Sequence, residues 1–161
     1  MSAPSLSDRL RQKLHLKRYL EELSALTGRS VQADELGSLE QAAAMRTAAQ
    51  RADAQSSARC EIRFSDTSSE RFRKFLQRLT DANPSSVYVW TPRTIDCGAL
   101  LVASLAAIKF DFDFAINDEG ILAFTTSDLA DSLLLDFSST PAREQVMTVE
   151  TQGPNWASAV Y

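Results

Sequence analysis

The chain has 161 residues, of which 44% are hydrophobic and 24% are charged, as in soluble globular proteins, and this length suits a single domain over residues 1–161. Five glycines and five prolines exclude a collagen-like chain, no apolar run reaches the roughly 20 residues that span a membrane, and Met1–Asp8 lacks the pattern of a secretory signal peptide. The formal net charge is −4, and we expect a cytoplasmic protein.

Residues 5–27 carry the signals of a helix. Ser5 and Asp8 have the spacing of a capping box, and Gly28 suits the left-handed position that follows a helix end. The leucines between them project to two sides, Leu6, Leu10 and Leu14 to one and Leu16, Leu20, Leu23 and Leu26 to another. We therefore expect this helix to be contacted on two sides or to bend.

A second, alanine-rich helix is predicted from Val31 or Asp34 to Ser56. Together the two helices are expected to form an antiparallel hairpin over residues 1–58. Residues 59–161 then supply the sheet of the domain, with one or two helices packed on one face.

The next elements alternate between strand and helix. Residues 60–64 alternate in polarity and predict a strand, and Thr67 with Glu70 has the form of a capping box that opens a helix. The apolar side chains of that helix fall on one face, and Asn83-Pro84 ends it. Residues 87–90 predict another strand, and residues 98–107, apolar on all sides, favour a buried helix.

Residues 108–116 alternate strictly between apolar and polar side chains. This pattern predicts a strand with Phe112 and the other apolar residues on one face and Asp111 and Asp113 on the opposite face. Residues 117–120 predict a turn, followed by strands at 121–124, 132–137 and 145–151 and a short final strand at 156–161. The expected fold class is α+β, an N-terminal helical hairpin followed by an antiparallel β-meander.

The cysteine and histidine content argues against a zinc site or a thiol nucleophile. Cys60 and Cys97 do not form a close pair, and His15 is the one histidine. A zinc site needs about four ligands, or three with water, so all three residues would have to converge from distant segments. We interpret both cysteines as core residues and His15 as part of a solvated face.

Enzyme chemistry has one candidate pair of residues. Asp111 and Asp113, two positions apart on a strand, point the same way and resemble the paired carboxylates that hold divalent cations. No EF-hand loop, glycine-rich phosphate loop or Gly-x-Ser-x-Gly elbow accompanies them. We therefore predict no catalytic residues, no metal and no cofactor, and keep a metal-dependent enzyme as the weaker alternative.

Charge is divided unevenly along the chain. Residues 1–80 hold 14 of the 17 lysines and arginines and 10 of the 21 acidic residues, a net of +4, whereas residues 81–161 have a net of −8. The cations of the first and third helices are interpreted as paired with the acidic sheet or solvated rather than as a nucleic-acid site. Few aromatic residues interleave with them, the pattern of a recognition helix is absent, and the protein is acidic as a whole.

The acidic residues after residue 110 predict a protein-binding surface. Clustered like charges cost stability through repulsion, which a cationic partner would offset. A negative surface of this kind attracts a basic protein and repels nucleic acid. The predicted partner-binding residues are Asp111, Asp113, Asp118, Glu119, Asp128 and Asp131.

Three segments carry a family resemblance. Residues 118–124, 133–137 and 153–156, about a third of the chain, resemble the C-terminal part of small immunity proteins of contact-dependent growth inhibition and other polymorphic toxin systems. The resemblance implies a cytoplasmic, non-enzymatic protein that binds and neutralises one toxin domain, often a nuclease. It assigns no individual contact residue.

The sequence thus predicts an immunity protein with a basic toxin domain as its partner and with no direct nucleic-acid or membrane partner. The alternative from a different class is an acidic secretion chaperone or adaptor, which binds an extended client segment along a hydrophobic groove. Salt and client state distinguish them, because an immunity complex forms with a folded toxin and weakens as salt rises.

Overall fold

The computed structural model of the protein describes residues 3–51, 57–159 and 161. Its strands are β1 (Ser57–Arg63), β2 (Val87–Trp90), β3 (Leu100–Val102), β4 (Ile121–Thr126), β5 (Ser132–Ser139) and β6 (Gln145–Gln152). Its α-helices are α1 (Leu6–Thr27), α2 (Leu39–Arg51), α3 (Glu70–Ala82) and α4 (Thr94–Cys97). Short 3-10 turns are η1 (Ala33–Glu35), η2 (Phe64–Ser68) and η3 (Leu105–Ala107).

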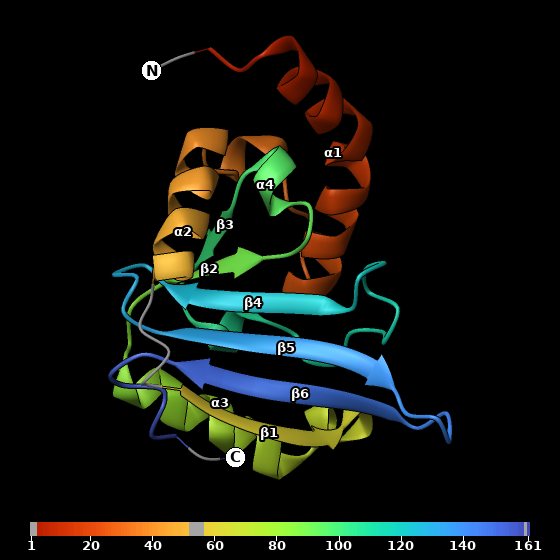
Figure 1. Ribbon diagram of the computed structural model, residues 1–161, viewed down its shortest axis with the longest axis vertical. Helices are drawn as coiled ribbons and strands as arrows, with labels where there is room; N and C mark the ends of the chain where they lie inside the picture. Colours follow the sequence, from red (N-terminus) through yellow and green to blue (C-terminus); the bar gives the residue numbers. More distant parts are fainter. Residues whose placement is uncertain (1–2, 52–56, 160) are drawn as a thin grey trace.

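The strands form one antiparallel sheet in the order β1-β6-β5-β4-β2-β3 (Figure 1). The predicted meander is its centre, β4-β5-β6, joined by consecutive turns. The earlier strands β2 and β1 extend it on either side, next to β4 and β6. The α+β fold class expected from the sequence, with helices first and an antiparallel sheet after them, is confirmed.

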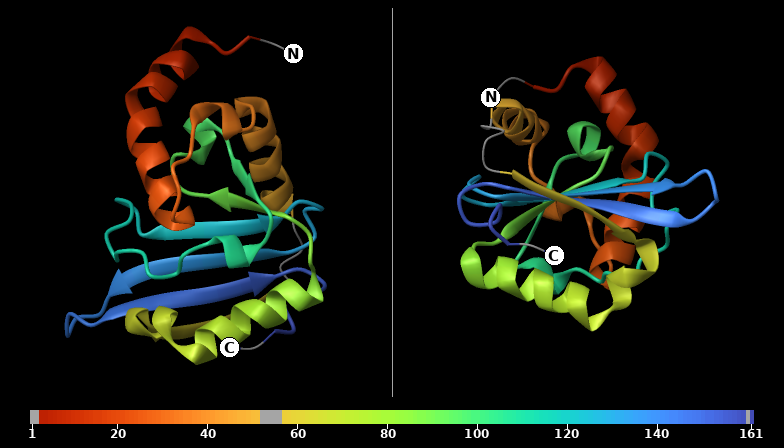
Figure 2. Two further views of the ribbon diagram at one scale, coloured as in Figure 1. Left: turned by 180° about the vertical axis from the view of Figure 1, so that it is seen from behind. Right: turned by 60° about the horizontal axis from the view of Figure 1, so that its bottom comes forward.

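One face of the sheet carries the apolar core. Along β4 and β5 every second residue is buried, so that Leu122, Phe124, Leu133 and Leu135 point to the same side. Helix α3 packs on this side, whereas α2 lies on the opposite side, where the Gln41 amide donates a hydrogen bond of 3.1 Å to the Tyr88 hydroxyl (Figure 2). The helices therefore cover both faces rather than one.

Helix α1 begins and ends where its sequence predicts. The Ser5 side chain accepts from the backbone N–H of Asp8, and Asp8 accepts in return from the Ser5 N–H. Gly28 follows the last turn with φ 65°, the left-handed conformation that glycine adopts without steric cost. The C-terminal half of α1 enters the core through Tyr19, Leu23 and Leu26.

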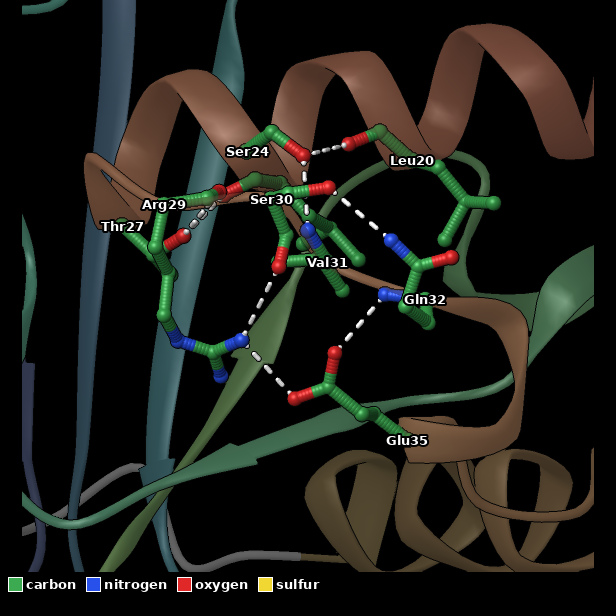
Figure 3. Close-up of polar contacts among 9 residues, drawn as sticks. Leu20, Ser24, Thr27, Arg29, Ser30, Val31, Gln32 and Glu35 are labelled. Carbon is green, nitrogen blue, oxygen red and sulfur yellow. Dashed lines mark hydrogen bonds and ion pairs between the residues drawn. The ribbon is translucent and has the colours of Figure 1, made fainter.

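A polar network reverses the chain after α1 (Figure 3). The Ser24 hydroxyl donates to the Leu20 carbonyl and accepts from the Val31 N–H at 3.0 Å. Glu35 accepts from Gln32 N–H at 2.7 Å and pairs with Arg29 at 2.8 Å. These contacts lower the pKa of the Glu35 carboxyl, and the hydrogen bond from the Gln32 N–H has the largest effect.

The reversed segment runs back along the sheet edge before α2 begins. Leu36 bridges to Leu100 of β3, and Gly37 donates to the Ala99 carbonyl at 2.9 Å. Consequently α1 and α2 both run toward the sheet, with α4 between them, instead of forming the expected antiparallel hairpin (Figure 1). The predicted helix end at Ser56 lies outside the described residues, as do residues 52–56.

Helix α3 has the expected apolar face but a different cap. Phe72, Phe75 and Leu79 are buried, and the helix stops at Asn83. Ser69, not Thr67, is the cap: its hydroxyl accepts from the Phe72 N–H at 3.1 Å. Thr67 instead lies in η2, where its hydroxyl donates to the Phe64 carbonyl, so the turn before the helix takes up the residue expected to start it.

Three predicted elements are wrong, those at 98–107, 156–161 and 108–116. Residues 98–107 form the edge strand β3 and η3 rather than a buried helix. Gly98 has φ 99°, a conformation that an α-helix does not use, and a Cβ there would collide with the Gly37 carbonyl. The backbones of Gly98 and Gly37 thus approach too closely for a helix to begin at Gly98. The final strand expected at 156–161 is a series of turns in its described residues, because buried Trp156, whose indole N–H donates to the Leu79 carbonyl, fixes it under the sheet.

The strand predicted at 108–116 is a loop. Its inside–outside alternation is nevertheless retained, with Ile108 and Phe112 buried, Phe110, Phe114 and Ile116 half-buried, and Lys109, Asp111, Asp113 and Ala115 exposed. Next to β4, into which the segment leads, the sheet has no free edge, since β2 and β5 occupy both sides of that strand. Of the helices in the part of the chain that the structure describes, none combines the length and the apolarity needed to cross a bilayer.

Phe112 tests this facing. Replacing Phe112 with Ala should lower the free energy of unfolding by about 3–5 kcal/mol, because it leaves a cavity among buried aromatic rings. Urea denaturation measures the change. An exposed neighbour, Ala115→Ser, is the control and should leave stability unchanged, whereas unaltered stability of Phe112→Ala would show that the ring is not core.

Candidate functional site

The candidate site is the segment from Ile108 to Gly120, which we call the acidic loop. It leaves η3, crosses the apolar face of the sheet and ends at the start of β4. Four of the six predicted partner-binding residues lie in it, and all four are exposed: Asp111, Asp113, Asp118 and Glu119.

Aromatic contacts hold the acidic loop against the core. The ring of Phe112 lies 5.8 Å from that of Phe64 and 5.6 Å from that of Phe137, measured between centroids. Phe114 packs edge-on against Phe64 at 5.1 Å, and Phe110 contacts Phe72 of α3 at 5.4 Å. Edge-to-face pairs of this kind add to the gain from burial. The inward residues therefore fix the direction of the carboxylates between them.

Polar contacts fix both ends of the loop. At the start, Lys109 N–H donates to the Leu26 carbonyl at the end of α1. At the end, the buried Asn117 side chain accepts from Glu119 N–H at 3.1 Å and Gly120 N–H at 2.8 Å, and donates to the Ile121 carbonyl. Gly120 has φ 66°, as the predicted turn requires.

The carboxylates of the loop are not equivalent. Asp118 pairs with Arg18 of α1 at 2.7 Å, so its charge is partly neutralised within the molecule. The Asp113 carboxylate accepts a hydrogen bond from Ala115 N–H, and Asp111 and Glu119 have no ion pair among the described residues. The negative charge available to a partner thus comes from Asp111, Asp113 and Glu119.

Asp128 lies apart from the acidic loop. It sits in the β4–β5 turn, at the other end of β4, which is about 20 Å long at the usual rise per residue. Its carboxylate accepts from the Thr126 hydroxyl at 2.6 Å and from Ala130 N–H at 3.0 Å. These hydrogen bonds lower the pKa of the Asp128 carboxyl, and the bond from Thr126 has the largest effect. They also shape the turn.

Asp131 is a structural residue and cannot serve as a docking contact. It is 2% exposed, and its carboxylate accepts from the backbone N–H groups of Asn155 and Trp156 and from the side chains of Asn83 and Asn155, at 2.7–3.0 Å. It joins the end of α3, the β4–β5 turn and the C-terminal segment. The structure therefore removes Asp131 from the predicted binding surface.

The predicted acidic surface is accordingly divided. Asp111, Asp113, Asp118 and Glu119 share one loop, whereas Asp128 faces solvent at the far end of β4 and Asp131 is internal. Alternation along strands does not reveal this division, because it specifies the side of a residue but not the end of the sheet at which its turn lies.

A groove of about 640 Å³ runs between the acidic loop and α3. Its floor is apolar and consists of Phe72, Leu76, Leu105, Ile108 and Phe110. Asp111 and Lys109 stand on one rim, and Glu70 and Arg73 on the other. Sequence analysis does not identify this groove, because its two walls are 30 residues apart in the chain and meet only in the fold.

The basic residues of α3 are largely engaged within the chain. Glu70 pairs with Arg73 at 3.5 Å and Lys74 at 3.6 Å. The Arg71 guanidinium lies 4.5 Å from the centre of the Tyr161 ring. These contacts agree with the interpretation of the cations as internally paired rather than as a phosphate-binding row.

Glu22 is a buried acid that the sequence pattern does not single out. Its side chain is 8% exposed, its Oε1 lies 3.8 Å from Arg18 Nε, and its Oε2 has no hydrogen-bond partner among the described residues. Burial, opposed by the charge of Arg18, raises the pKa of this carboxyl. In the sequence it resembles its exposed neighbour Glu21, and only α4 packing against α1 distinguishes them.

The thiols are not activated. Burial raises the pKa of Cys97 to about 11, and burial likewise raises that of Cys60. A nucleophilic cysteine needs a lowered pKa. In residues 3–51, 57–159 and 161, no three His, Cys, Asp or Glu side chains are grouped so as to hold a metal ion, and this includes Asp111 and Asp113.

Comparison of the chain with protein-family models, with curated proteins and with solved structures finds no match. The geometry of the acidic loop and of the surfaces around it is therefore the basis on which a function is inferred.

Removing the Asp131 carboxylate should destabilise the fold. Asp131→Ala leaves buried backbone donors of Asn155 and Trp156 without an acceptor, and we expect a loss of about 3 kcal/mol in the free energy of unfolding. Asp131→Asn, which keeps one oxygen for the backbone donors, should lose less. Urea denaturation compares the two. Equal, small losses in both variants would contradict the structural role.

Glu22 should make stability depend on pH. Because its folded pKa is raised, the native state holds a proton that the unfolded chain releases, so stability falls as pH rises from the ordinary glutamate range through the folded pKa. Glu22→Gln should be more stable than the wild type at pH 7, by on the order of 1 kcal/mol, and should lose this advantage near pH 4. Thermal denaturation across this range measures the effect. The control Glu21→Gln should keep the wild-type pH dependence, and a Glu22→Gln variant that does so too would disprove the assignment.

Proposed function

We propose that the protein is a non-enzymatic inhibitor of the immunity type, which binds a cationic toxin domain through the acidic loop. The observation that carries the proposal is the alternation along the loop: inward aromatic rings are fixed in the core, and the carboxylates of Asp111 and Asp113 between them are held outward. No backbone ladder holds this segment. Aromatic packing and the turn at Asn117 hold it instead.

Carboxylates on a backbone that is already packed in place suit recognition of a basic partner. A segment whose backbone is already ordered loses less conformational freedom on binding, which favours affinity. A negative potential also raises the association rate with a positively charged surface. Nucleases must be basic around their active sites to hold phosphates, so a nuclease domain is the partner whose chemistry fits best.

The remaining surfaces support binding rather than chemistry. The thiol pKa values are raised, not lowered, and the groove beside the loop has an apolar floor with opposed charges on its rims. A catalytic site would need a nucleophile or base set against a partner that activates it. The acidic loop instead offers a negatively charged surface of defined shape, as expected of a protein that binds another protein.

The groove between α3 and the acidic loop favours a second candidate, the secretion chaperone or adaptor. Its apolar floor would accept the side chains of an extended client segment. A chaperone complex of this kind would form with an unfolded client and persist at high salt, whereas the immunity complex requires a folded domain and weakens with salt.

Charge reversal on the loop tests the proposed function. Asp111→Lys with Asp113→Lys should slow association with a folded cationic toxin domain by about tenfold at low salt. Stopped-flow or biosensor kinetics measure the rate. Asp136→Lys with Glu144→Lys, two exposed acids outside the loop, changes the net charge equally and serves as the control. If both double variants associate at the wild-type rate, the loop is not the binding surface.

A further inference from the structure

Helix α1 has a second apolar face that the fold does not cover. Leu6, Leu10 and Leu14 are 68%, 59% and 75% exposed. With about 100° between successive helical residues, they lie on the side of α1 opposite Tyr19 and Leu23, which are buried. The first turns of α1 project beyond the rest of the molecule (Figure 1). We call this side the outer face of α1.

The cations of α1 flank this row of leucines on two sides. Arg11 and Arg18, on one flank, pair with Asp8 at 2.8 Å and with Asp118 at 2.7 Å. Lys13 and Lys17, which lie beside the leucines on the outer face, are exposed and have no ion pair in the part of the chain that the structure describes. The outer face therefore fits a surface that is both apolar and negatively charged.

The same chain carries such a surface. The groove beside α3 has an apolar floor, and the acidic loop continues from its rim with Asp111, Asp113 and Glu119 exposed. Of the other residues on the rims, Glu70 pairs with Arg73, and the methylene carbons of Lys109 lie over Gly28. The groove has a volume of about 640 Å³, which is large enough to receive leucine side chains.

The outer face cannot reach this groove within one molecule. The opposite side of α1 is fixed in the core through Tyr19, Leu23 and Leu26, so the outer leucines point away from their own chain. A second copy is the occupant with matching chemistry. Direct pairing of two outer faces is disfavoured, because it would bring Lys13 and Lys17 of both copies together.

We propose that two copies of the chain associate reciprocally, the outer face of α1 in each copy lying on the acidic loop and groove of the other. A two-fold arrangement makes both contacts at once and closes, so it ends at a dimer. In this binding mode an amphipathic helix lies in a groove, and leucines spaced four residues apart are its anchor residues. It does not depend on the proposed toxin partner, although that partner would compete for the same carboxylates.

Sedimentation analysis of the pure full-length protein tests the proposal. The wild type should be a dimer at high protein concentration and low salt and should dissociate as salt screens the charges. Leu10→Ser with Leu14→Ser should abolish the dimer while leaving the circular dichroism spectrum unchanged. Leu101→Ser, an exposed leucine on β3, is the matched control and should remain dimeric.

A charge exchange between copies identifies the surfaces. Lys13→Glu with Lys17→Glu, and separately Asp111→Lys with Asp113→Lys, should each give monomers, because each places like charges across both contacts. An equimolar mixture of the two variants should restore a dimer, since both contacts are then between opposite charges. Arg59→Glu with Arg63→Glu, on β1, is the charge-matched control and should dimerise as the wild type does.

Three outcomes would overturn the proposal. The first is a wild type that stays monomeric at every concentration. The second is a dimer that the leucine pair abolishes but the Asp111 and Asp113 reversal does not, which would indicate pairing of two α1 helices. The third is a monomer that co-sediments with phosphatidylglycerol vesicles through Leu10 and Leu14, which would assign the outer face to a lipid surface. Binding of a toxin domain is measured in none of these arms, so the two proposals fail separately.

Discussion

The packing of Phe112 against Phe64 and Phe137 is the contact on which the functional surface depends. The acidic loop has no strand partner, so its backbone is not held by a ladder of hydrogen bonds. Burial of every second side chain replaces that ladder, and edge-to-face ring packing gives it a defined geometry. A strand would present its carboxylates from a regular sheet, whereas this loop presents them over α3 and beside a groove, where a partner can surround them.

A buried charge holds the opposite end of the molecule. The Asp131 carboxylate accepts from Asn83 at the end of α3 and from Asn155 and Trp156 of the C-terminal segment, and each of these donors is an uncharged group. A buried carboxylate is tolerated when hydrogen bonds replace the water it has lost. This arrangement requires glycine at position 153, because a Cβ there would collide with the Ala130 carbonyl and with Asp131. The Gly-Pro-Asn-Trp segment is therefore explained by packing alone.

Charge in this protein is arranged at two levels. Within the molecule, Arg18 pairs with Asp118 and connects the basic helix to the acidic loop. Beyond that contact, cations and carboxylates without ion pairs remain on separate surfaces, the outer face of α1 and the acidic loop. The division of charge between the halves of the sequence is thus only partly cancelled by folding, and the uncancelled part marks the surfaces argued to bind other molecules.

The sequence by itself determined the local features: the caps of α1, the apolar face of α3, the strands β4 to β6, and which residues of the segment 108–116 face inward. These depend on side-chain chemistry and periodicity within a few residues. Whether 108–116 became a strand was decided by tertiary structure, because β2 and β5 had already taken both edges of β4. Tertiary structure likewise buried Asp131 and Glu22 and separated Asp128 from the acidic loop, since spacing along a chain does not specify which turns meet in space.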